Sequence, residues 1–163
     1  MVQLVGDRFF TLLEAVVKPD ASIVLGQKLC VGKEGRQEVV RIKGRIAFID
    51  LTNAARETLS AVLKKIILER ENDFIHFINR AGPISIRVHT LDLLPGVGKK
   101  NMEAILQERE KQPFANFEDM HKRIPTLVDP MGVFIHRILS ELEGKEKYYL
   151  FTKPPREFEQ RRY

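Results

Sequence analysis

The stretch LLPGVGKK, residues 93–100, combines the residue types that bind phosphate through the main chain. Gly96 and Gly98 flank Val97, and Lys99 and Lys100 follow directly; we call residues 96–100 the glycine turn. Glycine has no Cβ, so it permits a positive φ angle and lets a ligand approach the backbone closely. The N-terminus of a helix presents unpaired N–H groups and the positive end of the helix dipole. If a helix begins at Gly98, the glycine turn can therefore hold an anion, with Val97 packed inward.

The two lysines strengthen this hypothesis. Lys99 and Lys100 would lie in the first helical turn, where a cation opposes the helix dipole unless an anion neutralises both. The simpler interpretation is a tight connection between two helices with nothing bound, since short glycine turns are common. Residues 91–143 carry 7 basic and 9 acidic side chains, so an anion site there depends on local geometry and not on bulk charge.

The first third of the chain predicts short strands. Residues 9–51 contain apolar runs rich in Val, Ile and Phe, separated by turn signals. Gly44 interrupts a two-residue alternation and predicts a bulge or a sharp bend. Because about five short strands cannot cover two sheet faces, we expect a small β-barrel that closes on itself. After it, Thr52 is the expected N-cap of a long helix with apolar residues at helical spacing.

From Thr90 onward the pattern is helical. A short helix precedes the glycine turn, and a longer one runs from Gly98 to about Pro113. Asn116 and Asp129 are the expected N-caps of two more helices, and Gly144 is expected to end the last one. The predicted fold class is α+β, a small N-terminal barrel joined to an all-α C-terminal domain. The predicted segments are a barrel over 1–51, a helical linker region over 52–88, a helical domain over 89–144 and a basic, aromatic tail over 145–163, whose first half can form a docked strand and whose end is expected to fray.

A second basic cluster lies in RIKGR, residues 41–45. Arg41, Lys43 and Arg45 are expected close together on one face of the barrel, where such charge can bind a nucleic-acid strand. Plain surface solubility is the alternative interpretation. Arg87 precedes the glycine turn and would extend a track of phosphate contacts.

Other chemistry-bearing patterns are absent from the sequence. The histidines His76, His89, His121 and His136 lack metal-ligand spacing, and no Ser-His-Asp set, Walker-type loop or Cys-x-x-Cys occurs. We therefore predict no enzyme, metal, cofactor or small-molecule substrate. No apolar run approaches the roughly 18 residues of a membrane span, so no membrane association is expected. Cys30 is expected to be a small buried residue in a reducing cytoplasm.

The helical region resembles a known nucleic-acid-binding motif. The short helix, the LPGVGK turn and the helix bearing Ile105 and Leu106 resemble a helix-hairpin-helix, which binds the nucleic-acid backbone through the hairpin amides. FANFEDMHKRIP followed by DPMGVFIHRILSEL resembles the linker and second hairpin of the paired helix-hairpin-helix domain in competence-type DNA-binding proteins. The second turn, residues 124–132, lacks the glycine–hydrophobic–glycine pattern. We expect it to complete the core.

Nearly the whole chain resembles the archaeal family of unknown function DUF655. The resemblance is carried by FFTLLEAVVKP, KGRIAFIDLT, FINRAGPISIRVHTLDLLPGVGKKNMEAILQERE and KYYLFT. It implies an N-terminal barrel of the oligonucleotide-binding kind, a helical C-terminal part and an RNA- or DNA-binding role, and it implies no reaction.

The leading hypothesis is therefore non-enzymatic, largely sequence-independent binding of RNA or DNA. The contacts would come from the backbone amides of the glycine turn and from basic side chains. A protein-interaction adaptor in a ribosomal or DNA-repair assembly is the alternative, and a nuclease is a third hypothesis that no clustered carboxylates support. A helix-hairpin-helix DNA glycosylase is disfavoured, because Asp129 precedes Pro130 and is expected to cap a helix instead of acting on a base.

Overall fold

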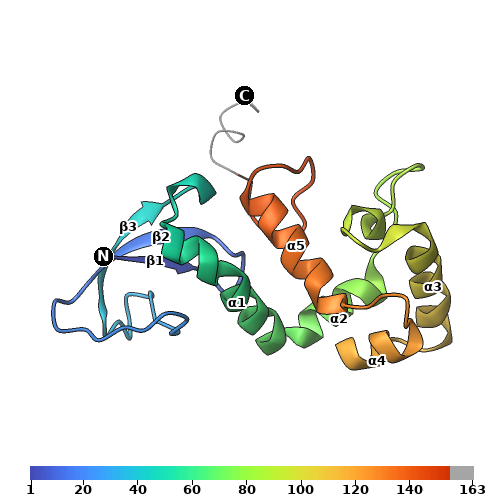
Figure 1. Cartoon of the computed structure of the whole chain (residues 1–163), viewed down its shortest axis with the longest axis horizontal. Coiled ribbons are helices and arrows are strands. Elements are labelled where there is room, and N and C mark those ends of the chain that lie inside the picture. The colour runs from blue at the N-terminus through green and yellow to red at the C-terminus, as the bar shows by residue number, and fades with distance from the viewer. Residues whose placement is uncertain (155–163) are drawn as a thin grey trace. The chain divides into compact units, whose positions relative to one another are not determined.

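The structure is a computed structural model, and it describes residues 1–154. These residues form two compact units. The first comprises Met1–Val62 with residues 138–154, and the second is Leu63–Arg137. Two helices, α1 (Asn53–Glu69) and α5 (Pro130–Leu142), each contribute to both units (Figure 1). The boundaries of the units thus fall inside helices and not at the composition shifts that delimit the predicted segments.

The first unit contains a three-stranded antiparallel sheet in the order β1-β2-β3 (Figure 1). The strands are β1 (Val2–Val5), β2 (Leu12–Val17) and β3 (Val39–Arg45). β1 pairs with β2 from Val2↔Ala15 to Val5↔Leu12. A short 3-10 helix, η1 (Phe48–Asp50), leads from β3 into α1, where Thr52 Oγ1 accepts a hydrogen bond from the Ala55 N–H at 3.2 Å. The predicted cap at Thr52 is confirmed.

The predicted β-barrel is wrong. The fold is α+β as expected, but the described sheet has three strands and stays open. The apolar run beyond Asp20, expected to form strands, is irregular, and Val24 and Leu25 are 68% and 73% exposed. Strands gain stability from cross-strand pairs and from a covered face, and these side chains have neither. Residues 18–38 instead form a long connection between β2 and β3.

The same connection overturns the expectation for Cys30. Its side chain is exposed, and Sγ lies 3.8 Å from the Glu34 carbonyl oxygen. The apolar neighbours that suggested burial lie in an irregular segment and not in a strand of the core.

Among the helices described here, none combines the length and the apolar character that a membrane crossing requires.

The bulge predicted near Gly44 is confirmed. Glu14 pairs with Gly44, but the next residue of β2, Ala15, pairs with Ile42, so Lys43 is the extra residue. A second shift lies between Val16 and Val17. An extra residue moves every following side chain to the other face of a strand, so the bulges change which β3 residues share a face.

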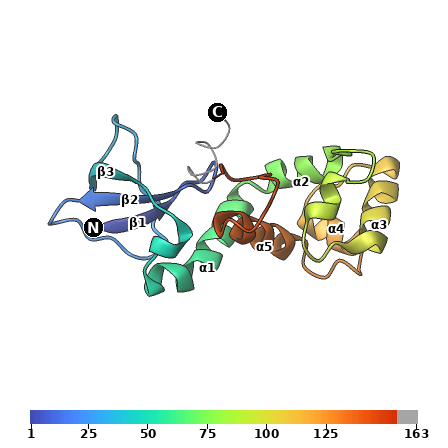
Figure 2. The ribbon, with the colours of Figure 1, turned by 90° about the horizontal axis from the view of Figure 1, so that it is seen from above.

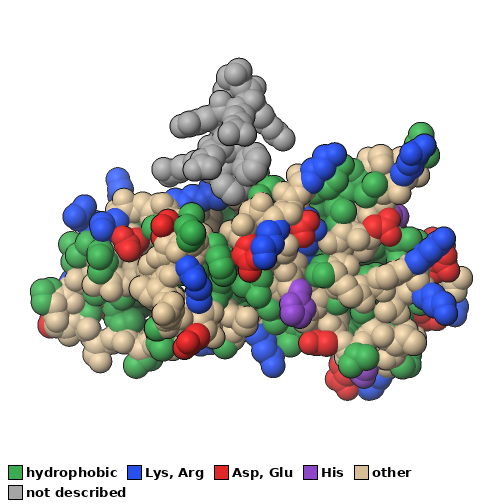
Figure 3. Space-filling model, turned by 45° about the horizontal axis from the view of Figure 1, so that its top comes forward, with side chains coloured by type: hydrophobic (Ala, Val, Ile, Leu, Met, Phe, Trp, Pro, Cys, Tyr) green, Lys and Arg blue, Asp and Glu red, His purple; other side chains and the backbone are tan. Residues whose placement is uncertain are grey.

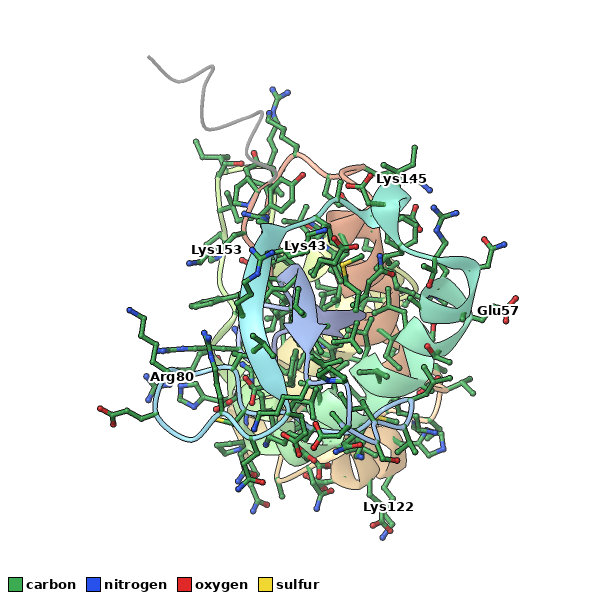
Figure 4. All side chains as sticks on the ribbon, turned by 90° about the vertical axis from the view of Figure 1, so that its left-hand side faces the viewer. Lys43, Glu57, Arg80, Lys122, Lys145 and Lys153 are labelled. Atoms are coloured by element: carbon green, nitrogen blue, oxygen red, sulfur yellow. The ribbon has the colours of Figure 1, made fainter. Side chains whose placement is uncertain are left out.

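The segment after α5 is held by one buried carboxylate. Glu141, 1% exposed, accepts hydrogen bonds from the N–H groups of Phe151 (3.1 Å) and Thr152 (3.0 Å) and from the Thr152 hydroxyl (3.1 Å). Arg45 donates to the carbonyl oxygens of Lys153 (2.7 Å) and Pro154 (3.0 Å). Figure 4 labels Lys153 beside β3. The segment is docked as predicted, but residues 145–154 form no strand, and the predicted frayed end lies outside the described residues.

The second unit is helical, as predicted. Besides parts of α1 and α5 it contains α2 (Glu71–Arg80), the 3-10 helix η2 (Thr90–Leu93), α3 (Gly98–Lys111) and α4 (Phe117–Arg123), and both views place α4 next to α3 (Figures 1 and 2). Its largely aliphatic core contains a cluster of aromatic rings. Phe134 of α5 lies 4.9 Å from the Phe74 ring, 6.1 Å from Phe77 and 5.9 Å from Phe117, between ring centroids.

The starts of α4 and α5 and the end of α5 follow the caps predicted from the sequence, whereas η2 is capped by His89 and not by Thr90 as the sequence indicated. Asn116 Oδ1 accepts from the Asp119 N–H at 2.7 Å, and Asp129 Oδ1 accepts from the Gly132 N–H at 3.0 Å. Gly144 has a φ of +74°, and its N–H donates to the Glu141 carbonyl oxygen at the end of α5. These three predictions are confirmed. They could be made from the sequence because each depends on a hydrogen bond between residues close together in the chain.

Candidate functional site

The glycine turn has the backbone conformation that only glycine adopts readily. Gly96 and Gly98 have φ angles of +80° and +65°, in the left-handed region. Val97 between them is 2% exposed. The two glycines therefore bend the chain outward while Val97 anchors the turn in the core, as predicted.

The outer side of the turn is open. A Cβ placed on Gly96 or Gly98 would meet no atom within 4 Å, and both residues are exposed. The N–H groups of Gly96, Gly98, Lys99 and Lys100 make no hydrogen bond to any acceptor in the described part of the chain, whereas the Val97 N–H donates to the Leu94 carbonyl oxygen at 3.3 Å. The turn thus presents donors at the positive end of the α3 dipole.

This helix start differs from those of α1, α4 and α5. Those three begin with a side-chain oxygen that accepts from the first turn, supplied by Thr52, Asn116 and Asp129. α3 has Val97 at its N-cap, with no capping side chain, and no acidic residue in its first turn. Lys99 and Lys100 are both exposed there. The α3 dipole is therefore left without an internal negative partner.

The entry to the glycine turn is held from two sides. Leu91 and Leu94 are 0% and 2% exposed. Arg137 of α5, 2% exposed, donates to the Leu93 carbonyl oxygen at 3.0 Å. A buried guanidinium is costly unless hydrogen-bonded, so this contact fixes the chain just before the turn. Sequence reasoning missed Arg137, although its position three residues after Phe134 put it on the apolar stripe of the helix.

His89 caps η2 with its ring. Nδ1 accepts from the Leu91 N–H at 3.1 Å, and the Asp92 carboxylate accepts from the His89 N–H at 2.9 Å. Burial lowers the pKa of His89, the nearby charge of Arg109 lowers the pKa further, and Asp92 partly opposes the change. The ring is therefore held neutral, which is the state in which Nδ1 can accept.

The second turn is closed by the protein's own side chains. The Asp129 carboxylate covers the first turn of α5, and a Cβ on Gly132 would collide with it. Ile124 and Leu127 are 2% and 4% exposed, so this turn completes the core as expected. The Thr126 hydroxyl contacts Asn101 Oδ1 at 2.6 Å, which places the second turn beside the first turn of α3.

The other end of α3 is tied to α4 by Arg123. Its guanidinium pairs with Glu108 at 3.3 Å and Asp119 at 3.2 Å and lies 4.3 Å from the Phe114 ring centroid. The hydrogen bond from Lys111 lowers the pKa of Glu108 most, and the Ala115 N–H lowers that of Asp119 most, with Arg123 adding to both. These contacts set the orientation of α3 and are structural.

The cluster at residues 41–45 is dispersed. Arg41 pairs with Val16 and Arg45 with Leu13, three positions apart on β2, so the expectation that both lie on one face is wrong. Lys43 pairs with Glu14 at 3.1 Å, and Arg45 is engaged by the carbonyl oxygens after α5. Lys43 is labelled next to β3 in Figure 4. Arg41 is exposed.

Arg87 lies in the same unit as the glycine turn, exposed in a loop closed by a bridge between Pro83 and His89. The residues 41–45 belong to the other unit. Of the predicted site residues, the structure thus groups Gly96, Val97, Gly98, Lys99 and Lys100 in one turn, with Arg87 near it in sequence. On the face shown in Figure 3, acidic and basic side chains are interspersed.

Metal-type side chains and a hollow are the other features of the described residues that bear on function outside the glycine turn. Within residues 1–154, no three His, Cys, Asp or Glu side chains are grouped so that they could hold a metal ion. A hollow of about 390 Å³ in the first unit is lined by residues that include Phe48, Ile49 and Arg56. The Arg56 guanidinium already contacts the protein itself: it donates to the Ile49 carbonyl oxygen at 2.7 Å and lies 5.5 Å from the Phe48 ring centroid.

The model of the family described as "Protein of unknown function (DUF655)" matches residues 1–153. The chain belongs to this family. An uncharacterised protein of Methanocaldococcus jannaschii is 37% identical over 155 residues, which cover 94% of this chain and 70% of that protein. The crystal structure of a DUF655 protein from Archaeoglobus fulgidus is similar with a TM-score of 0.87 and 40% identity, covering 93% of this chain and 84% of the other. The predicted resemblance to DUF655 is confirmed.

Proposed function

We propose that this DUF655 protein binds the sugar-phosphate backbone of RNA or DNA, without catalysis and largely without reading sequence, through the glycine turn. The observation that carries the proposal is the set of four N–H groups, at Gly96, Gly98, Lys99 and Lys100, that have no acceptor among the described residues. A phosphate oxygen supplies both the acceptors and the negative charge that this helix start lacks. Lys99 and Lys100 add two cations beside it.

The arrangement of elements supports the same proposal. The order η2, glycine turn, α3 resembles that of a helix-hairpin-helix, in which hairpin amides contact phosphates. Contacts to phosphate fix the position of a protein on nucleic acid and carry no base information. We confine the proposal to the glycine turn, because the Asp129 carboxylate occupies the corresponding amide in the second turn.

The test is the salt dependence of binding by the full chain. The substitutions Lys99→Ala and Lys100→Ala together should weaken binding to all sequences alike. They should reduce the slope of log K against log salt by up to about 1.8 on duplex DNA and about 1.4 on a single strand. The matched control is Lys64→Ala with Lys65→Ala, a second adjacent lysine pair in α1, which should leave the slope unchanged.

Comparison with the control also defines the result that would contradict the proposal. Equal slopes for the two double variants would remove the glycine turn from the binding surface. A panel of single- and double-stranded RNA and DNA at two salt concentrations then identifies the preferred nucleic acid.

An adaptor that binds another protein is the second candidate. The observation in its favour is the exposed apolar pair Val24 and Leu25 in the long connection of the first unit. A stoichiometric protein complex that survives nuclease treatment and is lost on Leu25→Ser would favour this function over direct nucleic-acid binding.

A further inference from the structure

A loop next to the glycine turn holds an isoleucine in solvent. The isoleucine loop, residues 83–89, connects α2 to η2 in the second unit. Ile86 at its tip is fully exposed, and Ile84 is 41% exposed. Single exposed apolar residues are common, so exposure alone assigns no role to this tip. Two further features of the loop matter: the hydrogen bonds that close it and the charges of the segment that contains it.

The loop is closed by a set of hydrogen bonds. The N–H groups of Ile84 and Ser85 donate to the Val88 carbonyl oxygen at 2.8 and 3.1 Å, and the Val88 N–H donates to Ser85 Oγ at 3.2 Å. Below them, the N–H and hydroxyl of Thr90 both donate to the Gly82 carbonyl oxygen, at 3.0 and 2.7 Å. These bonds fix the backbone, so the entropy cost of presenting Ile86 is met before any partner binds.

The loop belongs to a segment of the chain that is net basic. Residues 80–100 contain four basic side chains and one acidic one, Asp92, whose carboxylate accepts the His89 N–H. Residues 101–137 contain five basic and six acidic side chains. The apolar tip is followed directly by Arg87 and belongs to a basic segment. A nucleic acid has the matching chemistry, because it combines phosphate charges with stacked, apolar base faces.

Chain length limits the distance between tip and turn. Seven residue-to-residue steps separate His89 from Gly96. The first of these lie largely in the 3-10 helix η2, and the rest can be no longer than extended chain, so the two Cα atoms lie within about 20 Å of each other. Three more residues bring the tip within about 31 Å of Gly96. One turn of a duplex is about 34 Å long, so one bound molecule can contact both.

We propose that Ile86 inserts between neighbouring bases of the bound nucleic acid while Arg87 pairs with an adjacent phosphate. The inference rests on the proposed function and specifies its substrate. Side chains that enter a base stack must first separate the bases, which costs least where stacking is already weak. The preferred ligand is therefore a duplex interrupted by an unpaired base, and a continuous duplex binds more weakly.

The experiment compares a duplex carrying one bulged base with the same duplex without it, in RNA and in DNA. With the full chain, the bulged duplex should bind about tenfold more tightly, the size expected for one base contact. A 2-aminopurine beside the bulge should brighten as it unstacks. Ile86→Ser should abolish both effects and leave the affinity for the continuous duplex unchanged, and Ile86→Ala should weaken both effects.

Two controls come from the same loop. Ile84→Ser removes the neighbouring isoleucine and should retain the preference and the fluorescence change. Arg87→Ala should weaken both duplexes alike and reduce the salt slope by about 0.9.

The outcomes separate the two proposals. Equal affinity of the unsubstituted chain for both duplexes, or a preference that survives Ile86→Ser, overturns the insertion and leaves backbone binding in place. Failure of the unsubstituted chain to bind any of the duplexes overturns both. A lower mass in solution for Ile86→Ser, by light scattering and with the bulge preference intact, would show that the tip contacts a second protein chain, which also overturns the insertion.

Discussion

The two turns of the helical unit have opposite electrostatics although they lie side by side. The glycine turn before α3 has left-handed glycines, an apolar cap residue and four N–H groups without an acceptor in the described chain. The turn before α5 has a proline at the first helical position and the Asp129 carboxylate bound to the Gly132 N–H. The first presents positive charge to solvent, and the second carries its own anion.

The difference gives the stability that a helix start would lose in order to bind phosphate as proposed. A side-chain cap stabilises a helix by about 1 kcal/mol. The second turn keeps that stabilisation and takes part in the core. The glycine turn lacks the cap, retains two lysines that oppose the dipole, and depends on Val97 and on the Arg137 contact to Leu93 for its position. A protein that omits the cap at one of two neighbouring helix starts keeps that start available to an external anion.

The largest expected effect comes from converting the first turn into the second. Gly98→Asp places a carboxylate where the phosphate is proposed to lie, and aspartate tolerates the left-handed backbone better than most residues. Because charge-assisted hydrogen bonds contribute about 1.5–3 kcal/mol, nucleic-acid affinity should fall by between about tenfold and about 150-fold. Fluorescence anisotropy at fixed salt measures it.

Gly98→Asn is the matched control for this substitution. It keeps the same backbone preference and a similar shape but adds no charge, so it should cost less affinity than Gly98→Asp. Equal losses for the two variants would mean that shape and not charge governs the turn.

Local signals explain what the sequence predicted well. Thr52, Asn116 and Asp129 each accept a hydrogen bond from an N–H three residues later, so the spacing alone identified three helix starts. Gly96 and Gly98 were identified in the same way, since a positive φ is a property of the residue and its immediate neighbours. The conformation of the glycine turn therefore follows from its own residue types.

Long-range pairing explains what was missed. The apolar run that includes Val24 and Leu25 has the composition of a strand, but a strand also needs a neighbour, and none of the described strands pairs with it. The role of Arg137 depends on a carbonyl 44 residues away, and that of Arg45 on carbonyls 108 and 109 residues away. Such partners are set by tertiary structure, so the dispersal of the 41–45 cluster was not visible in the sequence.

A smaller effect, on the free energy of unfolding, is expected from substitutions in the second turn. Asp129→Ala should lower the free energy of unfolding by about 1 kcal/mol through loss of the cap. Gly132→Ala alone should be nearly neutral, because its Cβ displaces the Asp129 carboxylate while the gain in helix propensity, about 0.8–1 kcal/mol, offsets that loss. In the Asp129→Ala background the same substitution should stabilise by about 1 kcal/mol.

Urea unfolding of the four chains measures this coupling, which should be about 1 kcal/mol. Nucleic-acid affinity should change little in any of them, since this turn is not proposed to bind. Additive effects of the two substitutions would show that the carboxylate and Gly132 do not compete for the same space.

The smallest effect concerns the residue that caps η2 ahead of the glycine turn. Because the pKa of His89 is lowered in the folded chain, the unfolded chain takes up a proton near its ordinary pKa of about 6.5 while the folded chain remains neutral. The free energy of unfolding should therefore fall as the pH drops from about 6.5 toward the lower folded pKa, and should be unaffected by this group at higher pH. Protonation also removes the Nδ1 acceptor of the Leu91 N–H.

His89→Asn keeps a capping oxygen that does not titrate in this range. Melting temperatures at about pH 7.5 and about pH 5.5 should differ less for His89→Asn than for the unsubstituted chain, with His76, His121 and His136 present in both as an internal constant. An identical pH response of the two chains would place the sensitivity elsewhere. A reduced response would show that the short helix preceding the glycine turn is held by the neutral ring of His89, whose Nδ1 accepts from the Leu91 N–H.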